Sequence, residues 1–124
     1  MEIKTGIDII EVKRIQEAIE RQGEKFLKRV YTDKEIEYCN NTGKMQYQHY
    51  AARFAAKEAV FKAISTKLPK ETGDIWTKIE VQNDSKHKPI VNLEGLNLAE
   101  IESMDLSLSH IAEYAVASFN IIFK

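Results

Sequence analysis

A glutamate interrupts the apolar face of the longest helix that this sequence predicts. Between residues 45 and 65, the helical period places Glu58 near the centre of a face whose other members are Tyr47, Ala51, Phe54, Ala55 and Phe61. We therefore expect Glu58 to be at least partly buried. An unpaired charge there costs several kcal/mol, so the fold must supply a cation, a metal ion or a proton. Lys62, one turn later, is the local candidate.

A second carboxylate, Asp8, stands in an apolar segment that has the two-residue period of a β-strand. Residues 2–10 place isoleucines on one side and Asp8 on the other. Two carboxylates at such positions suggest a shared divalent cation. Oxygen ligands without His or Cys suit Mg²⁺, which usually binds substrate phosphates as well. Two alternatives stay open, namely a buried structural Glu58–Lys62 pair and an Asp8 at an exposed sheet edge.

Length and composition bound the class of protein. The chain of 124 residues predicts one domain, residues 1–124, and its 44% hydrophobic and 30% charged residues are typical of a globular protein. The single cysteine, Cys39, cannot form an internal disulfide, which favours a reducing compartment. No apolar stretch approaches the roughly 18 residues of a membrane span, and residues 1–4 lack the order of a signal peptide. We expect a cytoplasmic protein without a membrane partner.

The order of the predicted elements indicates an α+β fold. In chain order they are a strand at 2–10, helical segments within 12–30 separated at Gly23, a helix that begins with a capping box at Thr32 and Glu35, a long helix from about 46, a loop at 69–73, strands at 75–81 and 90–93, a short helix from 97 to about 104, and a hairpin of 106–109 with 114–123. We therefore predict helices packed on a largely antiparallel sheet.

Basic residues gather in the segment after the first strand. If the helix ran unbroken past Gly23, spacings of seven, four and three residues would align four of them on one face: Arg14, Arg21, Lys25 and Lys28. Such a stripe suits an acidic protein partner. A nucleic-acid partner is not expected, because glutamates interrupt the patch and no aromatic stacking platform accompanies it. A non-catalytic module that binds acidic proteins without Mg²⁺ is the alternative to an enzyme.

Arg53 and Lys57, which precede Glu58 in the same helix, have two interpretations. On spacing alone, Arg53 and Lys57 are expected on a solvated helix surface. If they lie on or beside the face of Lys62, they would add positive charge for a polyphosphate ligand.

The cysteine and the histidines offer a competing enzyme class. Cys39 could act as a nucleophile with His49 or His110 as its base, but no glycine-rich oxyanion turn lies nearby, and a lone cysteine is more often a packing residue. His110, at the end of a predicted strand, is the better candidate for a ligand contact. Its alternative is a turn residue whose ring caps backbone groups.

Three segments resemble the signature motifs of holo-acyl-carrier-protein synthases, the small bacterial class of 4′-phosphopantetheinyl transferases. They are residues 6–15 (GIDIIEVKRI), 53–63 (RFAAKEAVFKA) and 106–110 (LSLSH). Residues 26–35 and 76–81 are also similar, so the resemblance extends along the whole chain. It implies the 4′-phosphopantetheinyl transferase fold and transfer of 4′-phosphopantetheine from coenzyme A to a serine of apo-acyl carrier protein, which leaves adenosine 3′,5′-bisphosphate and supports fatty acid biosynthesis.

The resemblance also implies roles for individual residues. The implied catalytic set is Asp8, Glu58, Lys62 and His110, in which Asp8 and Glu58 hold Mg²⁺ against the coenzyme A diphosphate. The implied cofactor-binding set is Arg53, Lys57, Lys62 and His110, with Lys62 at the phosphates and Arg53 at the adenosine end. The implied surface for the acyl carrier protein is Arg14, Arg21, Lys25 and Lys28, with Arg14 as the firmest choice. A homotrimer with active sites between subunits is expected.

The chemistry of phosphoryl transfer agrees with these residue types. The reaction needs an aligned hydroxyl, neutralised charge at the transferred phosphate and a proton acceptor. Mg²⁺ and Lys62 would neutralise charge, while the acceptor is Glu58 or a metal-bound water molecule that it orients. Two departures from the family pattern leave loop contacts to coenzyme A open: residues 65–67 replace a glycine-rich turn, and residues 87–89 replace a Gly-x-Pro turn.

Overall fold

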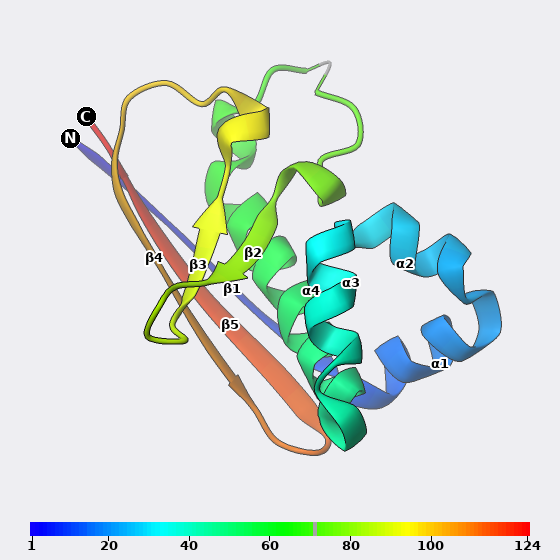
Figure 1. Cartoon of the computed structure of the whole chain (residues 1–124). Helices are drawn as coiled ribbons and strands as arrows, with labels where there is room; N and C mark the ends of the chain where they lie inside the picture. Colours follow the sequence, from blue (N-terminus) through cyan, green and yellow to red (C-terminus); the bar gives the residue numbers. More distant parts are fainter. Residues whose placement is uncertain (71) are drawn as a thin grey trace.

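An antiparallel sheet of three strands carries the longest helix of the chain. The computed structural model describes residues 1–70 and 72–124. The strands are β1 (Glu2–Glu11), β4 (Ile101–His110) and β5 (Tyr114–Phe123), in the order β1-β5-β4. Helix α4 (Gln46–Ile64) packs on one face of this sheet against β1 and β5 (Figure 1). The α+β prediction with a largely antiparallel sheet is confirmed.

Smaller elements surround α4 on its other sides. They are α1 (Val12–Gln22), α2 (Glu24–Val30), α3 (Asp33–Asn40), the two-stranded sheet of β2 (Glu80–Asn83) and β3 (Pro89–Asn92), and the 3₁₀ turns η1 (Gly43–Met45), η2 (Ser65–Lys67), η3 (Trp76–Lys78) and η4 (Glu94–Leu96). Both α3 and β2 contact α4, so α4 lies between them and the large sheet (Figure 1). The helix is therefore enclosed on more than one side.

Local sequence signals fix several boundaries. Thr32 and Glu35 form the predicted capping box at the start of α3. Gly23 adopts a φ of 58° between α1 and α2, so the predicted break is confirmed and the helix does not run on. The strand 114–123 has the predicted bounds, and it pairs with both β1 and β4.

Alanines and one glycine allow α4 to approach the sheet closely. The buried alanines of α4 are Ala51, Ala52, Ala55, Ala56, Ala59 and Ala63. A β-carbon added at Gly6 in β1 would lie 1.8 Å from the carbonyl oxygen of Ala59. Because that neighbour is backbone, only glycine fits at this point. The close approach brings the side chain of Asp8, two residues further along β1, towards α4.

Two predicted elements are wrong. The segment 75–81 is not a continuous strand, because η3 occupies Trp76–Lys78 and β2 begins only at Glu80. A buried lysine of α4 binds the carbonyl oxygens of Trp76 and Ile79, so these groups point to the helix and not to a neighbouring strand. The predicted helix from 97 to 104 is also wrong, since pairing with β5 draws residues 101–110 into β4.

The sequence predicts a loop at residues 69–73 and no membrane-spanning segment. The predicted loop at 69–73 includes Glu71, which lies outside the described residues. In the described part of the chain, no helix combines the length and apolar character that crossing a membrane requires.

Candidate active site

The carboxylates of Asp8 and Glu58 lie close together where β1 meets α4. Lys62 joins the group, because its Nζ lies 3.2 Å from Oδ1 of Asp8 and donates to the carbonyl oxygen of Ile7 at 2.9 Å. Burial, and next to it the charge of Asp8, raises the pKa of the Glu58 carboxyl, while Lys62 opposes this shift. Residues far apart in sequence are thus gathered at one point.

Glu58 and Lys62 do not form the structural ion pair that was one alternative. Among residues 1–70 and 72–124, Glu58 takes part in no ion pair, and Lys62 pairs with Asp8. The Lys62 side chain is about half exposed, whereas Asp8 is largely covered. Asp8 is therefore not the exposed edge residue of the other alternative, because its side chain faces α4.

The two carboxylates fit a hard divalent cation. They supply oxygen ligands from two different elements. Burial, and next to it their mutual repulsion, raises the pKa of Glu58, and a cation between them would relieve the repulsion. Within the described residues, no cluster of three or more His, Cys, Asp or Glu side chains suits a metal ion. A cation here would need further oxygen atoms from a substrate or water, which is the usual situation of Mg²⁺.

Arg53 and Lys57 are buried, so the expectation of a solvated helix surface is wrong for both. Arg53 is 3% exposed and Lys57 is 0% exposed. The expectation that they share or flank the face of Lys62 is also wrong. Arg53 precedes Lys62 by nine residues and Lys57 precedes it by five, which correspond to about 180° and 140° around a helix. The Arg53 side chain accordingly contacts Tyr38 of α3 and Asn83 of β2.

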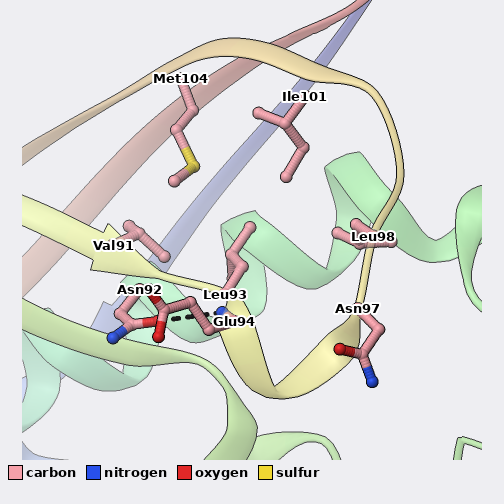
Figure 2. Close-up of a pocket in the computed structure, with 8 residues that line it drawn as sticks. All are labelled: Val91, Asn92, Leu93, Glu94, Asn97, Leu98, Ile101 and Met104. Atoms are coloured by element: carbon pink, nitrogen blue, oxygen red, sulfur yellow. Dashed lines mark hydrogen bonds between the residues drawn. The ribbon is translucent and has the colours of Figure 1, made fainter.

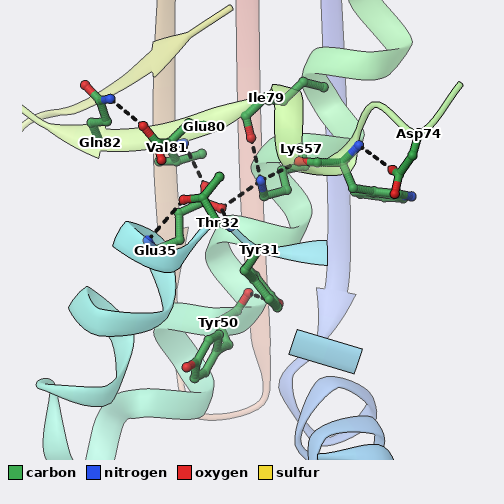
Figure 3. A network of polar contacts seen from close by, with 11 residues as sticks. Tyr31, Thr32, Glu35, Tyr50, Lys57, Asp74, Ile79, Glu80, Val81 and Gln82 are labelled. Atoms are coloured by element: carbon green, nitrogen blue, oxygen red, sulfur yellow. Dashed lines mark hydrogen bonds and ion pairs between the residues drawn. The ribbon is translucent and has the colours of Figure 1, made fainter. Parts of the chain in front are cut away.

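Lys57 belongs to a buried polar network that the sequence did not reveal (Figure 3). Its Nζ lies 2.8 Å from Oε1 of Glu35 and also donates to the carbonyl oxygens of Trp76 and Ile79. Glu35 accepts from the backbone N–H of Val81 at 2.7 Å. Burial lowers the pKa of Lys57, and the Glu35 carboxylate opposes this shift. The ammonium group therefore ties α4 to α3 and β2, and it does not face a ligand surface in this structure.

The signal for this network was present but ambiguous. Glu35 lies one turn before Cys39, and both are buried on the same side of α3. The capping box by itself explains a glutamate at this position, so there was no reason from sequence to expect that Glu35 also pairs with a buried lysine. The burial of Lys57 could not be predicted, for a different reason. The helical period identifies one apolar face, but it does not show whether other elements also pack on the opposite side of the helix.

Near the start of α4, aromatic and histidine side chains form a cluster that includes His110. Nδ1 of His110, at the end of β4, lies 2.8 Å from Oε1 of Gln48. The His110 ring meets the ring of His49 edge to face, with centroids 5.2 Å apart, and His49 meets Tyr38 in the same way at 5.6 Å. Within the described residues, His110 thus contacts a side chain and does not cap the backbone of a turn. Gln48 and His49 lie in the first turn of α4, whereas Glu58 and Lys62 lie in its second half.

Cys39 does not have the properties of a nucleophile. Its side chain is fully buried, and burial raises the pKa of its thiol to about 12. The reactive form of cysteine is the thiolate, which is scarce at such a pKa. The structure therefore gives no support to the thiol-enzyme alternative.

The basic residues expected to bind a protein partner are all exposed, but on two helices. Arg14 and Arg21 lie on α1, while Lys25 and Lys28 lie on α2, beyond the break at Gly23. Lys28 forms an ion pair with Asp33 at 2.7 Å. The single stripe of an unbroken helix is therefore not formed, although both helices present positive charge to solvent.

A cavity of about 630 Å³ lies away from all of these residues, between β3, η4 and the start of β4 (Figure 2). It is lined by Val91, Asn92, Leu93, Glu94, Asn97, Leu98, Ile101 and Met104. The Oδ1 atom of Asn92 accepts from the backbone N–H of Glu94 at 2.9 Å. With one carboxylate and mostly apolar walls, this cavity lacks the grouped charges of the Asp8 site, and we do not assign the chemistry to it.

Comparison with known proteins gives a consistent result. Residues 4–118 match the family model of the 4′-phosphopantetheinyl transferase superfamily. A holo-[acyl-carrier-protein] synthase of Ruminiclostridium cellulolyticum is 48% identical over 94% of this chain and 90% of that protein. A homologue of the same name from Chloroherpeton thalassium is 45% identical over 93% of each.

Solved structures agree with the sequence relatives. A holo-(acyl-carrier-protein) synthase from Bacillus anthracis in complex with CoA (3′,5′-ADP) is 37% identical, with a TM-score of 0.75 over 95% of this chain and 94% of that one. The Helicobacter pylori holo-[acyl-carrier-protein] synthase in complex with coenzyme A is 31% identical, with a TM-score of 0.79 over 95% and 99%. The chain therefore belongs to the holo-acyl-carrier-protein synthase family of the 4′-phosphopantetheinyl transferase superfamily.

Proposed function

We propose that this protein transfers 4′-phosphopantetheine from coenzyme A to a serine hydroxyl of apo-acyl carrier protein, leaving adenosine 3′,5′-bisphosphate. The observation that carries the proposal is the group of Asp8, Glu58 and Lys62 at the contact of β1 with α4. Family membership supports it, since relatives bear the name of this activity and two solved relatives hold coenzyme A or its nucleotide.

Asp8 and Glu58 are the residues that would hold Mg²⁺. When bound there, the ion would neutralise charge on the diphosphate of coenzyme A. Lys62 has an exposed ammonium group that can move from Asp8 to a phosphate oxygen, which adds positive charge at the reacting phosphate. Glu58, or a water molecule that it orients, is our candidate to accept the serine proton, although a carboxylate that holds Mg²⁺ is a weaker base than a free one.

We propose that the complete site forms between copies of the chain in a homotrimer. Within one chain, the groups proposed for the adenosine end, Arg53 and His110, contact different elements from Asp8 and Glu58. A site between two copies lets one chain supply the carboxylates and its neighbour supply Arg53 and His110.

The outer face of the large sheet supports assembly. Ile3, Ile7 and Ile9 of β1 are 66%, 64% and 63% exposed, on the face opposite α4. Several large apolar side chains along one strand form the kind of patch that proteins usually cover with a partner. Light scattering of the purified protein should give a mass of three chains, and a monomer at working concentration would contradict the assembly.

The acyl carrier protein would dock on α1 and α2. Arg14, Arg21, Lys25 and Lys28 are exposed there and would attract an acidic partner, mainly by raising the association rate at low salt. Arg14→Glu should raise KM for the carrier protein, and the difference from wild type should shrink at high salt. An unchanged KM would contradict this surface.

The test of the activity is direct. The protein is incubated with coenzyme A, Mg²⁺ and several apo-carrier proteins, and the carrier is weighed by mass spectrometry for the phosphopantetheine adduct. We expect an adduct with wild type and none with Glu58→Gln, which keeps the shape of the side chain but removes its charge. No adduct with any carrier would reject the proposed function.

The setting of this reaction is also part of the proposal. We place the protein in the cytoplasm and in fatty acid biosynthesis, and the free, buried thiol of Cys39 is consistent with a reducing compartment. Depletion of the protein should lower both holo-carrier protein and new fatty acids in the soluble fraction of its source cell. Normal amounts of both would contradict this role.

A further inference from the structure

Arg53 is a buried cation without a carboxylate partner in the described part of the chain. Its guanidinium group donates one hydrogen bond, from Nη2 to Oδ1 of Asn83 at 3.3 Å, and its buried Nε has no hydrogen-bond partner among residues 1–70 and 72–124. A buried charge normally has a counter-ion because desolvation is costly. Arg53 therefore has donor capacity that the folded chain leaves unused.

The aromatic ring of Tyr38 packs against this charge. The carbon atom Cζ of Arg53 lies 4.0 Å from the centre of the Tyr38 ring, in cation–π geometry. The contact joins α3 to α4, as the Glu35–Lys57 ion pair also does. Tyr38 follows Glu35 by three residues and Arg53 precedes Lys57 by four, so the Tyr38–Arg53 and Glu35–Lys57 contacts lie side by side between the two helices. Both contacts thus hold α3 against α4.

His49 links this contact to His110. His49 lies one turn before Arg53, and its ring contacts both the Tyr38 ring and the His110 ring edge to face. Burial, and next the charges of His110 and Arg53, lowers the pKa of His49. The His49 ring is therefore neutral at neutral pH and adds no charge beside Arg53 and His110.

We propose that Tyr38 and His49 are positioning residues for coenzyme A. They hold the guanidinium group of Arg53 and the imidazole of His110 in fixed places at the anion-binding end of the cofactor site. Tyr38 stabilises the Arg53 charge while no phosphate is present, and His49 keeps the two basic groups apart. This inference rests on the proposed function and adds two residues to the cofactor site.

The test separates the ring of Tyr38 from its hydroxyl group. Tyr38→Leu removes the cation–π contact, whereas Tyr38→Phe keeps it and is the matched control, because the Tyr38 hydroxyl has no hydrogen-bond partner in the protein among residues 1–70 and 72–124. We expect Tyr38→Leu to raise KM for coenzyme A about tenfold, which corresponds to about 1.4 kcal/mol, with kcat changed less than about twofold. KM for the carrier protein should stay unchanged, and Tyr38→Phe should behave like wild type. His49→Ala should resemble Tyr38→Leu, and His49→Phe should recover most of the loss.

A binding measurement keeps the inference separate from the proposed function. Titration of each variant with adenosine 3′,5′-bisphosphate by calorimetry should show the same order of affinity, whether or not the protein transfers phosphopantetheine. If wild type binds the nucleotide but forms no holo-carrier protein, the proposed function fails and the titration still decides the role of Tyr38.

Three results would overturn the inference. The first is an unchanged or tighter affinity in Tyr38→Leu, since that outcome means that the ring covers Arg53 without positioning it. The second is an equal loss in Tyr38→Phe, which would assign the effect to the hydroxyl group. The third is no binding of the nucleotide by folded wild type. Thermal unfolding of each variant shows that the compared proteins are folded.

Discussion

At the scale of the residue, ionised Glu58 lowers the stability of the fold, and the same carboxylate is proposed to act in the reaction. Its position between β1 and α4 removes it from water and places it near the charge of Asp8, and both effects favour the protonated carboxyl. The folded state therefore binds this proton more tightly than the unfolded chain does. Ionisation of Glu58 thus costs stability as the pH rises from the ordinary value of 4.5 through the raised pKa.

Glu58→Gln should for this reason be more stable than wild type at neutral pH. The gain should shrink as the pH falls towards 4.5, where the wild-type carboxyl becomes protonated as well. Thermal unfolding of both proteins between pH 4.5 and 8 checks this, with the exposed Glu17→Gln as the matched control. A wild type that is more stable than the variant at neutral pH would mean that Glu58 gains a favourable partner in the folded state.

The two carboxylates could be found from sequence because each breaks a local period. Asp8 interrupts a strand and Glu58 interrupts an apolar helix face, and the fold brings them together. Lys57 could not be interpreted in this way. It looks like a surface residue by spacing, and only the packing of α3 and β2 on the second side of α4 makes it a buried one. The pattern of residues within one helix does not show that other elements pack on its second side.

At the scale of the element, the contact of β1 with α4 depends on Gly6. A methyl group at this position would meet the Ala59 carbonyl oxygen at 1.8 Å, so the strand and the helix must separate. Gly6→Ala should lower the free energy of unfolding by about 1–3 kcal/mol. It should also slow transfer by about 100-fold, because Asp8 and Glu58 move apart.

Gly95→Ala is the matched control for this prediction. A methyl group there would meet side-chain atoms of Lys78 at 3.6 Å, which is ordinary contact distance. Urea unfolding and the transfer assay should both show values close to wild type for this variant. Similar losses in the two alanine variants would mean that Gly6 has no special place in the contact.

The joint of α3, α4 and β2 should depend on Glu35 and Lys57 together. Lys57→Met leaves the Glu35 carboxylate buried without its ammonium partner and should cost about 3–5 kcal/mol. The double variant Glu35→Leu/Lys57→Met should cost less than the sum of the single variants. It should not reach wild-type stability, because the N–H of Val81 and two carbonyl oxygens lose their partner. Additive costs in urea unfolding would contradict the pairing.

The wrongly predicted elements have causes at this same scale. The isoleucines and the valine of 75–81 alternate as in a strand, but Lys57 captures the carbonyl oxygens on which a longer strand would rely. Asn97 and Glu100 have the spacing of a helix start, and both instead adopt positive φ in the turn before β4. Pairing with a distant strand and hydrogen bonds from a distant side chain determined the secondary structure of these segments. Neither can be read from a short window of sequence.

At the scale of the whole molecule, a site shared between copies predicts complementation. Arg53→Ala and Glu58→Gln should each be inactive alone, because every site lacks one half. After the two variants are unfolded, mixed in equal amounts and refolded together, activity should return to roughly a quarter of wild type, since each site draws its halves from two randomly chosen chains. A mixture as inactive as its components would show that both halves must come from one chain.

The central claim is that Asp8 and Glu58 act as one unit that holds Mg²⁺ against the substrate diphosphate. The most direct measurement is the transfer rate as a function of Mg²⁺ concentration for wild type, Asp8→Asn, Glu58→Gln and the double variant. If the two carboxylates share one ion, each single variant should lose nearly as much as the double, and the Mg²⁺ concentration for half-maximal rate should rise in both single variants. Independent, additive losses with an unchanged Mg²⁺ requirement would contradict the account.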